Sequence, residues 1–272
     1  HGALETPDGP QRLRGLAGSG KTVILALKAA FLHTTNPEWK IAVTYHTRSL
    51  RQQYEELIRR FCYELLGDEP DFSSIQIRPA WGSASEPGIY SQAAIAAGMP
   101  IYTFETAKNN WTRERAFEGA CDELLKTRPK ERSLEVYDAI LIDEAQDLPR
   151  PFFELAFLVS KGPHRIVWAY DELQNLTSYT MQGPEVLFGV DSASDKPNLF
   201  FTSGNERQDI VLPKCYRNSP WTLSAAHALG FGIYRSEGLV QYFDDHELWN
   251  DIGYEVVGGA PSPGGQVGGT SC

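Results

Sequence analysis

The stretch Arg14-Gly-Leu-Ala-Gly-Ser-Gly-Lys-Thr22 decides the fold of this chain, because it matches the pattern G-x-x-x-x-G-K-[ST]. Glycines at this spacing let the backbone turn tightly and point successive N–H groups at one anion. The apolar residues that follow predict a helix over about Lys21–Leu32, whose positive N-terminal end faces the same anion. The pattern therefore predicts a phosphate-binding loop, and the alternative is a Gly-rich turn without a ligand.

The fixed positions of this loop have distinct tasks when it holds a nucleoside triphosphate. Lys21 is expected to reach the β- and γ-phosphates, and the Thr22 hydroxyl to bind Mg²⁺. The residues predicted to surround the phosphates are Gly15, Gly18, Ser19, Gly20, Lys21 and Thr22.

The stretch Ala139-Ile-Leu-Ile-Asp-Glu-Ala-Gln-Asp147 predicts the other half of such a site. It is typical of a buried strand that ends in two carboxylates, and α/β proteins bind ligands at the carboxyl ends of their strands. Asp143 is expected to hold the Mg²⁺, and Glu144 to orient and deprotonate the attacking water. The alternative is an acidic pair that caps the helix expected over about 152–159.

Strands and helices alternate along the chain. The predicted strands begin by about Arg12 and continue at 40–45, 75–78, 100–104, 137–143 and 165–170, and further helices are predicted at 49–66, 91–97 and 221–229. This alternation is typical of an α/β fold in which helices cover both faces of a parallel sheet.

Composition narrows the class of protein. With 42% hydrophobic and 22% charged residues, the 272-residue chain resembles an ordinary soluble globular protein. No apolar run approaches the roughly 18 residues of a membrane span, so no membrane partner is expected. The four cysteines, Cys62, Cys121, Cys215 and Cys272, show no C-x-x-C spacing and are interpreted as reduced thiols of a cytoplasmic protein.

The charge balance bears on nucleic-acid binding. A net charge of −10 argues against a protein that coats nucleic acid without specificity, but it leaves room for a narrow binding track. Residues 108–132 carry seven basic and five acidic side chains. The basic excess is mild, so we interpret this segment as a solvated helical face and not as a nucleic-acid track.

Four further segments, in order, make the chain resemble the superfamily 1 helicases of the UvrD/Rep type. Tyr170-Asp-Glu-Leu-Gln174 resembles the family's G-D-x-x-Q segment, and Leu212-Pro-Lys-Cys-Tyr-Arg-Asn218 resembles L-x-x-N-Y-R-S. Thr44-Tyr-His-Thr47 and Thr103-Phe-Glu-Thr106 resemble the two segments that lie near single-stranded nucleic acid. The resemblance covers about residues 12–230. It implies a P-loop NTPase with a RecA-like sheet, and ATP and Mg²⁺ as cofactors.

The resemblance also implies roles for individual residues. Glu144, Gln174 and Arg217 become the expected catalytic residues, since Gln174 corresponds to the γ-phosphate sensor and Arg217 to an arginine that reaches the γ-phosphate from a second domain. Tyr216 corresponds to the residue that stacks on adenine. The residues expected to contact nucleic acid are Tyr45, His46, Thr103 and Tyr179, the last at the place of a family Trp.

The implied domain organisation is a RecA-like ATP-binding domain at 1–205, with small insertions at about 67–100 and 107–136. The truncated start of a second RecA-like domain follows at 206–257, and a Gly/Pro/Ser-rich tail at 258–272 is expected to be disordered. Because the chain stops before the family's last motifs, it is expected to be an N-terminal fragment that hydrolyses ATP slowly at most.

The expected function is Mg-ATP hydrolysis coupled to movement on a single strand, with DNA preferred to RNA as the partner. The alternative is a nucleotide-gated binding or signalling NTPase that does not unwind. Val23 stands where the family often has an Arg that helps to hold the adenine, so base stacking is expected to depend more on Tyr216. Glu105 and Tyr170 also depart from the family pattern and leave the direction of travel and the strand preference open. The oligomeric state is open as well.

Overall fold

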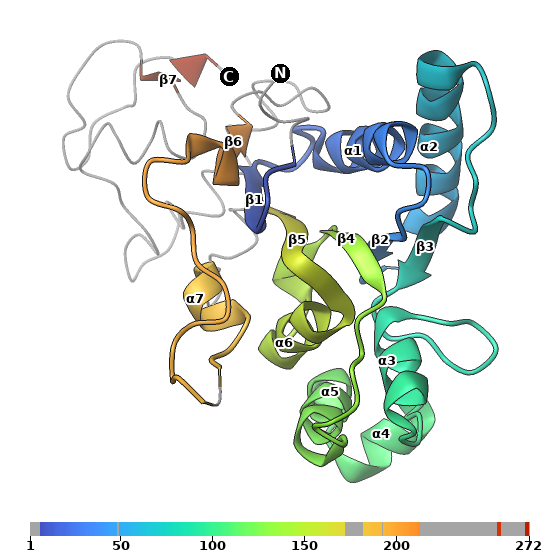
Figure 1. Ribbon diagram of the computed structural model, residues 1–272, viewed down its shortest axis with the longest axis vertical. Helices are drawn as coiled ribbons and strands as arrows, with labels where there is room; N and C mark the ends of the chain where they lie inside the picture. The colour runs from blue at the N-terminus through green and yellow to red at the C-terminus, as the bar shows by residue number, and fades with distance from the viewer. Residues whose placement is uncertain are drawn as a thin grey trace, which may run out of the picture.

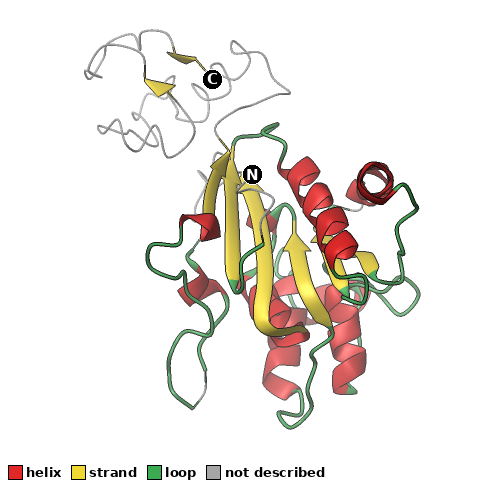
Figure 2. Ribbon diagram, turned by 45° about the horizontal axis from the view of Figure 1, so that its top comes forward, coloured by secondary structure: helices red, strands yellow, loops and turns green. Residues whose placement is uncertain are grey.

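Six parallel strands form the central sheet of the protein, in the order β3-β2-β4-β5-β1-β6 (Figures 1 and 2). The computed structural model describes residues 6–47, 49–171, 182–191 and 193–212, and the backbone of 255–256 and 270–271. The strands are β1 (Pro10–Gly15), β2 (Ile41–Tyr45), β3 (Ile75–Pro79), β4 (Tyr137–Ile142), β5 (Ser160–Asp171) and β6 (Asp209–Leu212). Their carboxyl ends share one edge of the sheet.

Helices cover both faces of this sheet (Figure 1). The helices are α1 (Lys21–Thr35), α2 (Leu50–Leu66), α3 (Ile89–Ala97), α4 (Phe104–Asn110), α5 (Ala116–Thr127), α6 (Arg150–Val159) and α7 (Pro184–Leu187), with short 3₁₀ turns at Ala145–Asp147 and Glu206–Gln208. α1 and α2 lie on one face, and α3, α5 and α6 on the other. Within the described residues, no helix combines the length and the apolarity that crossing a membrane requires.

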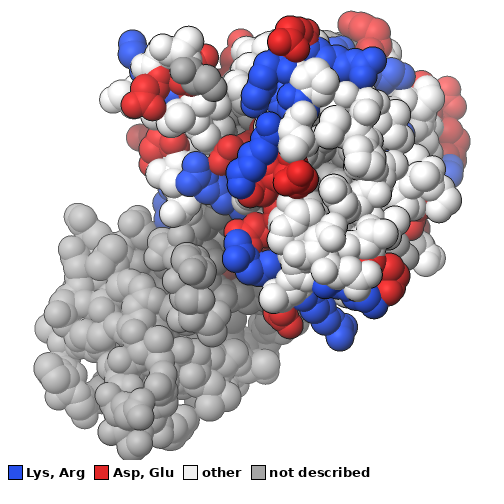
Figure 3. Space-filling view, turned by 90° about the horizontal axis from the view of Figure 1, so that it is seen from below, with Lys and Arg blue, Asp and Glu red and all other residues white. Residues whose placement is uncertain are grey.

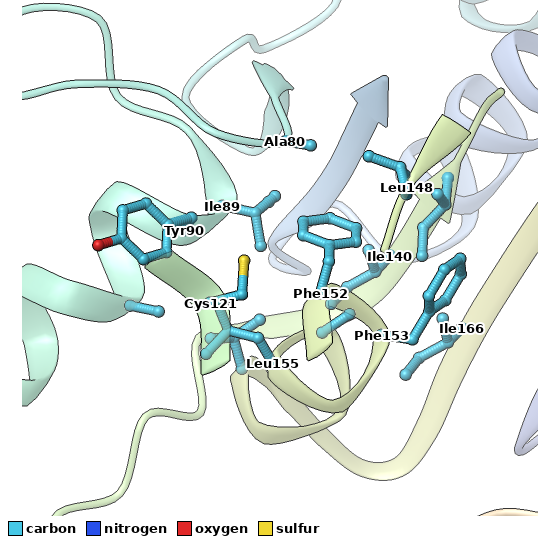
Figure 4. Close-up of a cluster of buried hydrophobic side chains, with 14 of the residues drawn as sticks. Ala80, Ile89, Tyr90, Cys121, Ile140, Leu148, Phe152, Phe153, Leu155 and Ile166 are labelled. Carbon is cyan, nitrogen blue, oxygen red and sulfur yellow. The ribbon is translucent and has the colours of Figure 1, made fainter. Parts of the chain in front are cut away.

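The alternation of side chains along each strand produces two separate cores. Ile140 and Ile142 of β4 pack with α3, α5 and α6, whereas Ala139 and Leu141 pack with α1 and α2. Phe152 of α6 is fully buried in the first of these cores (Figure 4). A strand that is covered on both faces needs apolar residues at every position, which explains the continuous apolar run of β4.

The predicted α/β fold, a parallel sheet flanked by helices on both faces, is confirmed. The helix predicted after the glycine loop is α1, and the apolar strand before the acidic pair is β4. The finer assignment to the RecA-like P-loop NTPases stays a prediction. Cys62 and Cys121 are buried free thiols, and burial, the largest cause, raises the pKa of Cys62 to about 11.

The strand predicted at 100–104 is wrong. Residues 100–103 run outside the sheet, and α4 begins at Phe104. Side chains satisfy the backbone there: the indole of Trp81 donates to the carbonyl of Tyr102 at 2.8 Å, and the N–H of Tyr102 donates to the hydroxyl of Tyr90 at 3.2 Å. Because these polar groups already have partners, the segment needs no neighbouring strand.

The predicted domain limits also differ from the structure. Strand β6 pairs with β1, so the first sheet continues past the boundary predicted at residue 205. The segments predicted as insertions, 67–100 and 107–136, supply β3 to the sheet and α3 and α5 to its cover, because their buried residues complete one core. Of residues 213–272, including the predicted tail, the described backbone is the antiparallel pair β7 (Glu255–Val256) and β8 (Thr270–Ser271).

Candidate functional site

The glycine loop leaves the carboxyl end of β1 and ends where α1 begins at Lys21. Gly18 and Gly20 have φ angles of 82° and 89°, in the left-handed region that side chains with a Cβ rarely adopt. The Lys21 ammonium donates to the carbonyls of Gly15 and Leu16, each at 2.8 Å. The glycines therefore permit a tight turn, and the lysine head lies against that turn.

The loop and the acidic pair meet at the same edge of the sheet. The Thr22 hydroxyl donates to Oδ2 of Asp143 at 2.7 Å, and the backbone N–H of Asp143 donates to the carbonyl of Thr44 at 2.8 Å. Asp143 is 3% exposed. The two residues predicted to share a Mg²⁺ are thus in direct contact.

Asp143 has a third contact that the sequence did not predict. The hydroxyl of Tyr54, on α2, donates to the same Oδ2 at 2.6 Å, and the N–H of Glu144 donates to Oδ1 at 2.9 Å. Burial, and then the negative charge of Asp143, raise the pKa of Tyr54 well above its usual value, so the phenol remains a donor at neutral pH. In the sequence, Tyr54 has the helical spacing of an ordinary core residue of α2, and no signal distinguished it.

Glu144 adopts an unusual backbone conformation. Its φ and ψ are 51° and 40°, a left-handed geometry that costs a non-glycine residue roughly 1–3 kcal/mol. Its carboxylate accepts a hydrogen bond from the backbone N–H of Thr47 at 3.1 Å, and its carbonyl accepts one from the N–H of Asp147 at 2.9 Å. Strained residues of this kind concentrate at functional sites, and this one holds a carboxylate beside Asp143.

Two further predicted segments begin at the same edge. Gly15 pairs with Asp171 on β5 and with Leu212 on β6, so the strand ends that lead into the motifs at 170–174 and 212–218 flank the loop. The predicted residues within those motifs, Gln174, Tyr179, Tyr216 and Arg217, lie outside the described residues.

The side chains present fit a Mg²⁺–nucleotide site. In proteins Mg²⁺ is commonly held by one or two carboxylates, with substrate phosphates and waters completing the shell. Asp143 and the Thr22 hydroxyl provide such a partial set of oxygens. Within the described residues no group of three or more His, Cys, Asp or Glu side chains could hold a metal alone. Such a partial set leaves the other positions around an ion to phosphate oxygens and waters.

A pocket of about 250 Å³ opens beside this site, beyond the ends of β2 and β3. Among its lining residues are His46, Trp81, Ser83, Thr103, Phe104 and Phe117. The Trp81 ring stacks on Phe117 with centroids 4.9 Å apart and meets the edge of Phe104 at 5.9 Å. Lys108 and Arg113 lie within 6 Å of the Phe104 ring. Two cations therefore lie beside one of the aromatic rings that line the pocket.

The predicted nucleic-acid contacts have mixed outcomes. His46 and Thr103 are exposed and line this pocket together, although Thr103 also accepts the N–H of Thr106 as the N-cap of α4. Tyr45 is wrong as a base-stacking residue, because it is 1% exposed and its ring stacks on Tyr54 at 6.2 Å. Both faces of β2 are covered, so all of its side chains are buried, including Tyr45. The sequence pattern of the strand end did not distinguish a buried Tyr45 from an exposed one.

The basic residues of 108–132 agree with a solvated helical face. Lys108 pairs with Glu105, Arg115 with Glu118 and Lys126 with Asp122, each within one helical turn. Figure 3 views the molecule from the side of α4 and α5 and shows basic and acidic side chains interspersed there. Comparisons of the sequence with protein-family models and with curated proteins found no match.

Proposed function

We propose that this chain is the ATP-binding part of a nucleic-acid translocase or helicase, in which Mg-ATP hydrolysis drives movement along a single strand. The observation that supports the proposal most directly is the 2.7 Å hydrogen bond between Thr22 and Asp143. It joins two sequence motifs that a nucleotide hydrolase must bring together. The adjoining aromatic pocket supports the choice of nucleic acid as partner.

In the proposed reaction the chain positions ATP rather than reacting covalently with it. Lys21 exchanges its backbone carbonyl partners for phosphate oxygens, and the N-terminal end of α1 adds its positive dipole. Thr22 and Asp143 would hold a Mg²⁺, which would supply positive charge to the phosphates. Glu144 accepts a proton from a water whose oxygen bonds to the γ-phosphorus as the bond to the bridging oxygen breaks, giving ADP and phosphate.

The strand is proposed to cross the pocket next to the nucleotide site. Trp81 and Phe104 offer ring faces or edges to bases. Stacking of this kind tolerates any sequence, because every base has an aromatic face. Lys108 and Arg113, whose charged groups lie within 6 Å of the Phe104 ring, are proposed to meet the phosphates of that strand, Lys108 in exchange for its ion pair with Glu105. His46, which lines the pocket, and Thr47, whose N–H donates to Glu144, both lie in the loop after β2. A nucleic-acid strand in the pocket would therefore lie next to Glu144, the proposed general base.

Nucleotide binding tests the proposal. Titration of the chain with a fluorescent ATP analogue and Mg²⁺ is expected to give saturable binding that Lys21→Ala weakens by roughly 10- to 100-fold, the equivalent of a charge-assisted contact. Lys40→Ala is the matched control, because Lys40 donates to the carbonyl of Ser73, away from the loop. Equal binding by the wild type and Lys21→Ala would contradict the proposal.

The alternative function, a nucleotide-gated binding or signalling NTPase, is separated by the effect of nucleic acid on turnover. The translocase proposal expects ATP turnover to rise when single-stranded oligonucleotides are added, even from a slow basal rate. Turnover that ignores both DNA and RNA would favour the alternative.

A further inference from the structure

The carboxylate of Asp143 is held by three donors from three separate parts of the chain. Thr22 of α1 and Tyr54 of α2 both donate to Oδ2, and the backbone N–H of Glu144 donates to Oδ1. Two of these donors belong to the predicted nucleotide motifs. The third, the phenol of Tyr54, comes from a helix that carries neither motif.

We infer that Tyr54 is a positioning residue for the metal site: its hydroxyl fixes the carboxylate of Asp143 and thereby aims the Thr22 hydroxyl at the Mg²⁺ of the nucleotide. This inference rests on the proposed function. The role belongs to the hydroxyl alone, since the ring of Tyr54 already packs in the core and stacks on Tyr45.

The direction of the Thr22 hydroxyl hydrogen decides where the lone pairs of that oxygen point. A threonine hydroxyl has one proton and two lone pairs, and at 2.7 Å the proton of Thr22 points at Oδ2 of Asp143. The lone pairs, which bind a metal, therefore point away from Asp143. Any rotation of the carboxylate moves this acceptor and turns the hydroxyl with it.

Tyr54 opposes that rotation. The Thr22 bond and the Glu144 bond hold one oxygen each, and the 2.6 Å bond from Tyr54 holds Oδ2 from a second direction. The fully buried position of Tyr54 on α2 gives this donor little freedom of its own. Partners that orient a metal ligand in this way typically change metal affinity by about 10- to 100-fold when they are removed.

A core role alone does not account for the hydroxyl. Phenylalanine would fill the same volume and keep the stack on Tyr45, without placing a polar group in a buried environment. The hydroxyl instead lies 2.6 Å from a carboxylate oxygen of Asp143, a buried residue of the predicted acidic pair. Its effect should therefore appear in the metal dependence of nucleotide binding, separately from stability.

The test is Tyr54→Phe, with Tyr137→Phe as the matched control. Tyr137 is also a buried tyrosine whose hydroxyl donates to side chains, those of Gln76 and Gln92, but it begins β4 at the opposite end from Asp143. Binding of a fluorescent ADP is measured during a Mg²⁺ titration and again in excess chelator. Circular dichroism and thermal unfolding of each variant show whether it folds.

The expected result is an apparent Mg²⁺ affinity about 10- to 100-fold weaker in Tyr54→Phe, with ADP affinity in chelator unchanged. Tyr137→Phe is expected to match the wild type in both. In the background of Asp143→Ala, Tyr54→Phe should have no further effect on the Mg²⁺ dependence, because its partner is gone.

The outcomes separate this inference from the proposed function. Wild-type binding that responds to Mg²⁺, with an identical response in Tyr54→Phe, would overturn the positioning role and leave the proposed function standing. A wild type that binds no nucleotide with or without Mg²⁺ would overturn both. If Tyr54→Phe lost affinity equally in Mg²⁺ and in chelator, the hydroxyl would be structural and the inference wrong. If Tyr54→Phe fails to fold, Tyr54→Leu, which also lacks a donor, decides, and an unchanged Mg²⁺ response in that variant also overturns the inference.

Discussion

The hydroxyl of Thr22 lies 2.7 Å from Oδ2 of Asp143, although 121 positions separate the two residues in the sequence. The contact joins the start of α1 to the end of β4 across an intervening strand, β5. A parallel sheet makes this possible because the ends of all its strands share one edge. The hydrogen bond thus converts two distant patterns into one site.

Replacing Thr22 by Val removes this hydroxyl and keeps the shape of the side chain. The variant is expected to lose at least about tenfold of the Mg²⁺-dependent gain in nucleotide affinity, since a ligand oxygen and an orienting bond disappear together. Fluorescent-nucleotide titration with and without Mg²⁺ measures the effect. Thr35→Val, whose hydroxyl donates to the carbonyl of Phe31 at the other end of α1, is the control. An unchanged Mg²⁺ response in Thr22→Val would exclude Thr22 from the metal site.

Glu144→Gln tests the proposed base. The amide oxygen of Gln can still accept the N–H of Thr47, so the local geometry is expected to persist while the proton acceptor is lost. Mg-ATP binding should be retained, and single-turnover hydrolysis should slow by about 10²- to 10⁴-fold. Glu64→Gln, on the exposed end of α2, should hydrolyse ATP at the wild-type rate. Wild-type hydrolysis by Glu144→Gln would assign the base elsewhere.

The parts of the site that the sequence predicted correctly depend on short-range patterns. The glycines before Lys21 require left-handed backbone angles, and Gly18 and Gly20 have them. The apolar run before Asp143 specifies a strand covered on both faces, which fixes where its carboxylate emerges. Each signal lies within a few residues of the structure that it predicts.

The parts that the sequence missed depend on contacts between distant segments. Tyr54 meets Asp143 because α2 packs beside the sheet, and Trp81 meets Phe104 because residues 100–103 run outside the sheet. The prediction that Tyr45 stacks on a base was wrong for a related reason, because the burial of Tyr45 depends on the helices that cover both faces of β2. The periodicity of apolar residues within one segment does not predict these contacts between segments.

Phe104→Ala tests the nucleic-acid pocket. The ring is 41% exposed, so its loss is expected to affect stability little while removing a surface on which a base can stack. Affinity for a labelled single-stranded oligonucleotide should fall by about 1–3 kcal/mol, measured by fluorescence anisotropy at constant salt. Phe200→Ala, an exposed phenylalanine on the segment before β6, is the control. Equal affinities in the wild type and Phe104→Ala would remove this ring from the proposed track.

Ion pairs join β6 to β1. Asp209 accepts hydrogen bonds from Arg12 at 2.9 and 2.5 Å and from Arg14 at 3.0 Å. Burial, the largest single cause, raises the pKa of Asp209, but the hydrogen bonds and charges of Arg12 and Arg14 together lower it below its ordinary value. The folded state therefore favours the ionised carboxylate.

A pKa that is lower in the folded than in the unfolded state stabilises the fold above the unfolded value and loses that effect as the pH falls through the folded value. Asp209→Asn is therefore expected to lower the free energy of unfolding by about 1 kcal/mol at neutral pH, a figure reduced for solvent screening. The deficit should shrink as the pH falls below 3.8, the ordinary pKa of an aspartate. Urea unfolding across this range measures it, with Asp68→Asn, at an exposed aspartate bonded to the N–H of Glu69, as control. A deficit that stays constant down to acid pH would show that β6 is held to β1 by its backbone pairing and not by these charges.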